Sequence, residues 1–108
     1  MRNDVIVAKL IEYIDKILGY TGSVDMKTFS ENSMMLEACV FCLSQMGELA
    51  KVLDDDFKAR HPGIPWVSVA SLRNKIVHDY EGVKVLLIWD IIENDLPELK
   101  LQLESIAV

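Results

Sequence analysis

The sequence predicts an all-α protein folded as an up-and-down bundle of five to six helices. Apolar residues recur every three or four positions along most of the 108-residue chain, which is the spacing of one helix face. We find no segment with the sustained apolar-polar alternation that is typical of a half-buried strand. Because the chain holds only five glycines and three prolines, the connections between helices are expected to be short.

The first two helices are predicted from an apolar face and from the residues that end and begin them. The face of the first helix has apolar residues at i, i+4, i+7 and i+8, namely Leu10, Ile14, Ile17 and Leu18. Gly19 and Gly22 are expected to close this helix. Ser23 can then cap a short second helix that reaches about Phe29.

A long third helix is predicted over residues 33–57, about 25 residues or about 38 Å in length. Its face steps by three or four residues through Leu36, Val40, Leu43, Gly47, Ala50, Leu53 and Phe57. Gly47 does not end the helix, since one helical glycine costs only about 1 kcal/mol. Its lack of a side chain would instead let a neighbouring helix come close.

Turn signals divide the rest of the chain. Residues 61–65 contain Pro-Gly and a second proline and form a turn by composition. A fourth helix is expected over residues 66–77, with a break at residues 79–82, and a fifth over residues 84–93. Asp95, followed two residues later by a proline, is expected to cap a short last helix.

Composition indicates one domain, residues 1–108, in the cytoplasm. The longest purely apolar run has six residues, far short of the roughly 20 that cross a membrane, and the first residues lack the layout of a signal peptide. The mean hydropathy of +0.21 is high for a small chain, so we expect a buried homodimer interface. Cys39 and Cys42 lie on an apolar helix face, which favours core packing over a metal or redox site.

Charge is distributed unevenly. The net charge is −6, which taken whole argues against a nucleic-acid partner. Residues 57–84, however, contain five Lys or Arg and two acidic residues, a charge of +3, and both histidines. One electropositive segment on an acidic chain is compatible with an anionic substrate that is held locally.

The chemically most informative residues are Arg73, Asn74, His78 and Tyr80, which fall within eight positions. Arginine offers a planar, permanently charged donor fork for phosphate oxygens, and histidine can transfer a proton near neutral pH. Asn74 and His78 are four residues apart and share a helix face. Arg73 and His78 are five apart and do not converge on one ideal helix, so they converge only at a helix end or across a two-fold axis.

This segment resembles the R-x-x-x-x-H-x-Y signature of the HEPN superfamily, in its HepT-like toxin branch. Three flanking blocks are similar to that family as well. Ile64-Pro65-Trp66 resembles its I-P-W block, residues 45–48 its I-G-E segment, and residues 89–97 its W-x-I-I-x-N-D-L-P stretch. The resemblance covers nearly the whole chain and implies a HEPN-like helical homodimer.

The resemblance also implies a function, which is metal-independent cleavage of RNA through its own 2′-hydroxyl at a cleft between protomers. His78 would transfer the proton, Arg73 would hold the scissile phosphate, and Asn74 would be a supporting polar contact. No cofactor or metal ligand is implied. A minimal nucleotidyltransferase antitoxin would silence the toxin by transferring AMP to Tyr80, because added phosphates would occupy the RNA phosphate site.

Simpler structural roles are open for each of these residues. His78 could cap the end of a helix, and Arg73 could pair with Asp79 or Glu81. Glu48 could orient Arg73 or could be an ordinary exposed residue. For the whole protein, two alternatives to a ribonuclease are a non-catalytic scaffold that binds a nucleotidyltransferase and a purely structural helical dimer.

Overall fold

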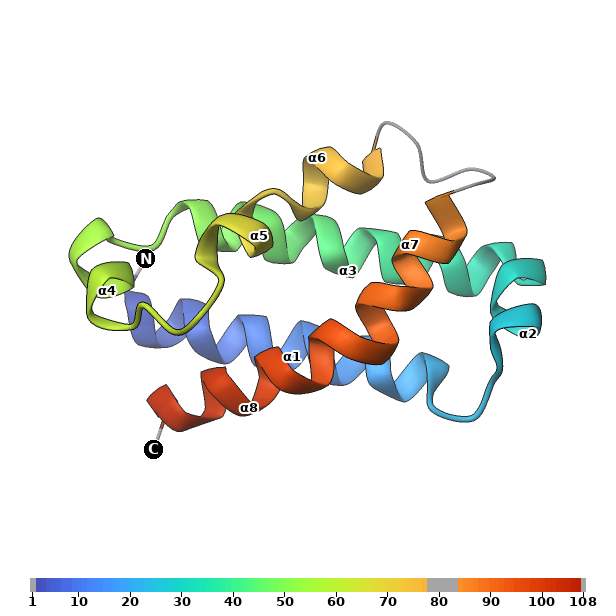
Figure 1. Ribbon diagram of the computed structural model, residues 1–108, viewed down its shortest axis with the longest axis horizontal. Coiled ribbons are helices and arrows are strands. Elements are labelled where there is room, and N and C mark those ends of the chain that lie inside the picture. The colour runs from blue at the N-terminus through green and yellow to red at the C-terminus, as the bar shows by residue number, and fades with distance from the viewer. Residues whose placement is uncertain (1, 78–83, 108) are drawn as a thin grey trace.

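Successive helical passes lie side by side and alternate in direction between the two ends of the molecule (Figure 1). The computed structural model describes residues 2–77 and 84–107, and every regular element in those residues is a helix. The all-α prediction is therefore confirmed, and the alternating passes agree with an up-and-down arrangement. The described residues form eight α-helical segments and one π-helical segment, more than the expected five to six helices.

The first pass is α1 (Asn3–Thr21), and α2 (Met26–Glu31) follows at the far end of the bundle (Figure 1). Gly19 lies inside α1 and does not end it; the helix stops at Gly22, its C-cap. The prediction that Ser23 caps α2 is wrong. Asp25 directly precedes the helix, and its carboxylate accepts a hydrogen bond from the Thr28 backbone N–H at 2.8 Å.

The second pass, α3 (Ser33–Lys51), is shorter than predicted. The helical spacing of apolar residues continues to Phe57, but the chain turns after Lys51 and begins α4 (Asp55–Arg60). Two hydrogen bonds hold this turn: the Asn3 side chain donates to the Asp54 carboxylate at 3.1 Å and accepts from the Asp54 backbone N–H at 3.3 Å. Acidic residues in the first turn of α4 also favour a helix start there.

The third pass is α5 (Trp66–Ala70) and α6 (Leu72–Val77), which are separate segments where one helix was predicted. The division falls at Ser71, whose hydroxyl donates to the Ser68 carbonyl at 2.9 Å. Such local side-chain bonds compete with regular helix geometry. The break predicted at residues 79–82 lies outside the described residues.

The last pass joins α7 (Lys84–Asp90), the π-helical turn η1 (Ile91–Asp95) and α8 (Leu96–Ala107) without a gap. Asp95 was predicted to cap a new helix, but it lies inside this continuous path. The Leu96 N–H bonds to the Ile91 carbonyl, five residues back. This π-helical turn ends two residues before Pro97. Proline cannot donate a backbone hydrogen bond, and its ring would clash with a regular preceding turn.

Helix α3 lies at the centre of the packing, against α1, α5 and α6. The core draws on every pass, and fully buried side chains include Ile14, Leu43, Ile76, Ile88 and Leu103. Across residues 2–77 and 84–107, every helix is too short or too polar to cross a lipid bilayer. The core thus fixes α6, which carries Arg73 and Asn74, directly on α3.

Candidate functional site

Gly47 sets the distance between α3 and the segment that carries Arg73. A Cβ atom at Gly47 would lie 3.1 Å from the Arg73 backbone nitrogen and 3.4 Å from the Ala70 carbonyl oxygen. Both neighbours are backbone atoms, which cannot rotate away. The expectation that Gly47 permits the close approach of a neighbouring helix is therefore confirmed, and the helix is the one that holds the predicted site.

One turn of α3 places Glu48 beside Arg73. The Arg73 Nε lies 3.2 Å from Glu48 Oε1, and the two side chains are 47% and 48% exposed. The sequence left open whether Glu48 orients Arg73 or is an ordinary exposed residue; in the structure it is exposed and contacts Arg73. In the described residues, then, the partner of Arg73 is on a different helix, whereas Asp79 and Glu81 lie outside those residues.

Lys51 shares the same carboxylate. Its Nζ lies 3.7 Å from Glu48 Oε2, one helical turn further along α3. Glu48 therefore bridges two cations, Lys51 and Arg73, at the molecular surface. Pairs this exposed contribute little to stability, about 0–1 kcal/mol, so the significance of the arrangement lies in where it holds the guanidinium.

Asn74 follows Arg73 on α6 and is exposed. Consecutive helical residues point about 100° apart, so Asn74 extends the polar surface sideways from Arg73. His78 and Tyr80 lie outside the described residues, and their convergence with Arg73 stays a prediction. The structure thus brings together Arg73, Asn74 and Glu48 of the five predicted site residues.

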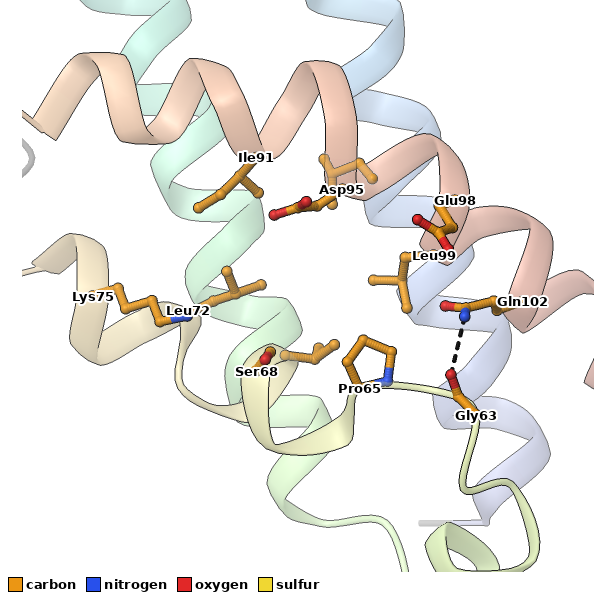
Figure 2. Close-up of a pocket in the computed structure, with 12 residues that line it drawn as sticks. Gly63, Pro65, Ser68, Leu72, Lys75, Ile91, Asp95, Glu98, Leu99 and Gln102 are labelled. Carbon is orange, nitrogen blue, oxygen red and sulfur yellow. Dashed lines mark hydrogen bonds between the residues drawn. The ribbon is translucent and has the colours of Figure 1, made fainter.

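A cavity of about 400 Å³ lies on the other side of the motif segment, between α5–α6 and η1–α8 (Figure 2). Leu72, Lys75, Ile91, Asp95 and Leu99 are among its lining residues. Its upper rim is apolar and acidic, and Gln102 crosses one end to donate to the Gly63 carbonyl at 3.0 Å (Figure 2). None of the described site residues lines this cavity, so it is separate from the predicted site.

The two cysteines belong to the core, as predicted. Cys39 and Cys42 lie on α3 and are 0% and 3% exposed. Burial raises the pKa of the Cys39 thiol to about 12, and the pKa of Cys42 is raised for the same reason. Both are therefore neutral thiols at physiological pH, and a thiol in this state is unreactive.

The three aspartates 54–56 and His61 lie around α4, away from the contact between Glu48 and Arg73. The three aspartates are exposed. His61 ends α4 with its ring centroid 4.8 Å from that of Phe57, and its carbonyl accepts from Trp66 Nε1 at 3.0 Å. Within residues 2–77 and 84–107, no three His, Cys, Asp or Glu side chains are grouped so that they could hold a metal ion.

The fold and the motif together define a ribonuclease of the HEPN superfamily. The chain belongs to its HepT-like family: the family model described as "Ribonuclease HepT-like" matches residues 10–106. This match spans most of the bundle and includes the whole R-x-x-x-x-H-x-Y segment.

Relatives from archaea and bacteria agree with this assignment. The chain is 33% identical over 97 residues to "Putative RNase MJ1216" of Methanocaldococcus jannaschii, covering 90% of this chain and 80% of the relative. It is 33% identical over 100 residues to "Probable ribonuclease HepT" of Thermococcus cleftensis, covering 93% and 88%. It is 32% identical to "Putative RNase TTE0752" of Caldanaerobacter subterraneus, covering 90% and 87%. No solved structure matches the chain.

Proposed function

We propose that the chain is a single-domain endoribonuclease toxin that cleaves RNA without a metal ion or cofactor. The observation that carries this proposal is the position of Arg73, which is held by Glu48 at the surface of a HepT-like fold. A permanently charged, oriented guanidinium is suited to a phosphate group that gains charge in a transition state. The electropositive segment around it provides a local attraction for RNA.

The reaction is an internal transfer within the RNA. His78 accepts the proton of a ribose 2′-hydroxyl, and the 2′-oxygen bonds to the adjacent phosphorus. The bond from phosphorus to the 5′-oxygen of the next nucleotide breaks, and that oxygen takes up the proton that His78 accepted. The products are a 2′,3′-cyclic phosphate and a 5′-hydroxyl, so no water is consumed in this step.

Arg73 and Asn74 act on the phosphate during this transfer. Arg73 pairs with its non-bridging oxygens and offsets the charge that develops on them. Asn74 donates a supporting hydrogen bond from the adjacent position. Glu48 is a positioning residue: it orients Arg73 and need not contact the RNA.

The active form is proposed to be a homodimer in which the two motifs line one cleft. Met34 and Phe41 are 79% and 57% exposed on α3 and lie seven residues apart. Glu48 is a further seven residues along, so these two exposed apolar side chains lie on the same face of α3 as the carboxylate that contacts Arg73. A second copy that covered this face would bring its own Arg73 towards the same region.

A minimal nucleotidyltransferase antitoxin is the proposed protein partner, acting in the cytoplasm. It would transfer AMP to the Tyr80 hydroxyl, and the added phosphate would compete with RNA for Arg73. A guanidinium suited to an RNA phosphate is equally suited to the phosphate of an AMP group.

The proposal is tested by inducing the chain and its His78→Ala variant in cells without the antitoxin. We expect only the unaltered chain to arrest growth and fragment RNA. The main alternative is a non-catalytic scaffold for a nucleotidyltransferase, which is favoured by the acidic net charge of −6. In that case both chains would be harmless, the parent Tyr80 would be unmodified, and the nucleotidyltransferase would still bind tightly.

A further inference from the structure

A second hollow, of about 560 Å³, lies against α5 and α6 and shares no lining residue with the cavity of Figure 2. It is lined by Lys51 and Lys58, by the polar side chains of Ser71 and Asn74, and by Trp66, Val67 and two alanines. We name it the lysine groove. Its volume lies in the range of about 300–1,000 Å³ that is typical of small-molecule and nucleotide sites.

The groove is continuous with the proposed active site. Asn74, the residue after Arg73, forms part of its wall. Lys51, another wall residue, lies 3.7 Å from the carboxylate of Glu48, whose other oxygen is 3.2 Å from Arg73. Two wall residues of the groove are therefore neighbours of Arg73 or of its partner Glu48.

Its charge is opposite to that of the chain as a whole. Among the described residues that line the groove, two are lysines and none is acidic, although the net charge of the chain is −6. Lys58 contacts Asp55 at 3.5 Å, but the side chain of that aspartate is fully exposed. The Lys58 side chain is partly buried and only the carboxylate is fully exposed, so an RNA phosphate can compete with Asp55 for the lysine from the solvent side.

The floor of the groove is apolar and fixed. The Trp66 ring is buried to 7% exposure, and its Nε1 donates to the His61 carbonyl at 3.0 Å. Val67, by contrast, is 85% exposed at the rim. An apolar floor beneath a cationic rim matches a ligand that presents sugar or base on one side and phosphate on the other.

We propose that the lysine groove holds the RNA strand next to the scissile phosphate, with Lys51 and Lys58 contacting flanking phosphates. The inference rests on the proposed ribonuclease function and extends it, because it names the direction in which the substrate leaves the cleavage site. RNA would run from Arg73 past Asn74 towards α4. The lysines contribute affinity for a strand, while Arg73 and His78 act on the single phosphate that is cut.

Binding to the His78→Ala protein tests this without cleavage. The probe is a fluorescein-labelled oligouridylate of about 12 nucleotides, followed by anisotropy at several salt concentrations. We expect Lys51→Ala and Lys58→Ala each to weaken binding about threefold to tenfold at low salt and to reduce the salt slope by about 0.7. Lys58→Arg, which keeps the charge, should retain the parent affinity.

Lys27→Ala is the matched control, since it removes the same charge from α2 at the other end of the molecule (Figure 1). If it weakens binding as much as the groove variants, or if the groove variants bind like the parent while Arg73→Ala does not, the groove assignment is overturned and the cleavage proposal stands. If the His78→Ala protein binds no RNA and the parent cleaves none, both proposals fail together.

Discussion

At the scale of single residues, the proposed RNA cleavage depends on the pair Arg73 and Glu48. Both side chains are about half exposed, so their ion pair contributes little to folding. The pair instead orients the guanidinium, because one fixed partner leaves the remaining N–H donors pointing in a defined direction. Stability and activity should therefore respond differently when the pair is broken.

Glu48→Gln is predicted to change the free energy of unfolding by less than about 1 kcal/mol while lowering RNA cleavage about tenfold. Arg73→Lys should lose more activity, because lysine lacks the planar fork. A double-mutant cycle on kcat is the measurement. If Glu48 acts through Arg73, Glu48→Gln adds little once Arg73 is lysine; fully additive losses would show that Glu48 has an independent role.

Cys39 provides a pH-dependent prediction. Burial holds the pKa of its thiol at about 12 in the folded chain, above the ordinary value near 9.0. The unfolded chain therefore loses the thiol proton first as pH rises. The stability contributed by the neutral thiol is complete below about pH 9 and declines until the folded thiol also ionises near pH 12.

We expect the free energy of unfolding of the parent to fall more steeply above about pH 9 than that of Cys39→Ala, by up to about 1.4 kcal/mol per pH unit. Denaturant titrations of both proteins at a series of alkaline pH values measure this difference. The two proteins share every other ionisable group, lysines and tyrosines included, so the contributions of those groups to the free energy of unfolding cancel in the comparison. Parallel pH profiles would contradict the placement of Cys39 in the core.

At the scale of the helices, the close contact between α3 and α6 determines where the motif lies. Gly47→Ala should gain about 1 kcal/mol in helix propensity but lose about 1–3 kcal/mol by pushing the Arg73 backbone away. We therefore predict a net loss of about 1 kcal/mol in chemical denaturation and a larger proportional loss of RNA cleavage.

Gly19→Ala is the matched control for that substitution. Gly19 also lies inside a helix, α1, but a Cβ there would meet nothing within 4 Å. It should stabilise the protein by about 0.5–1 kcal/mol and leave cleavage unchanged. If both alanines stabilise the protein and neither affects cleavage, Gly47 does not set the position of Arg73.

Helix periodicity and the motif were sufficient to predict the all-α class, the core cysteines and the close approach at Gly47. They could not predict where α3 ends, because the apolar spacing continues through Leu53 into α4. That turn is held by Asn3 and Asp54, which are 51 residues apart in sequence, and periodicity contains no information about such a contact.

The candidate site shows the same limit. Residue chemistry and the resemblance to the HEPN signature pointed to Arg73 and Asn74, yet Glu48 fitted both an orienting role and that of an ordinary exposed residue. Its orientation depends on how α6 is placed across α3, which is a property of tertiary packing. Lys58 belongs to the electropositive segment 57–84, but its place beside Asn74 could not be predicted, because it joins the groove only after the chain turns at Asp54.

At the scale of the whole molecule, the proposed dimer should depend on the exposed face of α3. Phe41→Arg places a charge on the face of α3 that also carries Met34 and Glu48, and it should convert a dimer into monomers in sedimentation equilibrium. RNA cleavage should fall with it, because two motifs line the proposed cleft. Leu101→Arg, at a 69% exposed position on α8, is the control and should leave both properties unchanged. A dimer that tolerates Phe41→Arg must use another face.

The most direct test of the central claim is to incubate the purified chain with RNA in EDTA and to analyse the new ends. We predict that the parent produces fragments that end in a 2′,3′-cyclic phosphate and a 5′-hydroxyl. The rate of cleavage should fall by more than about a hundredfold in His78→Ala, which should keep the parent helicity. Fragments that require added divalent metal, or that form equally with His78→Ala, would contradict it.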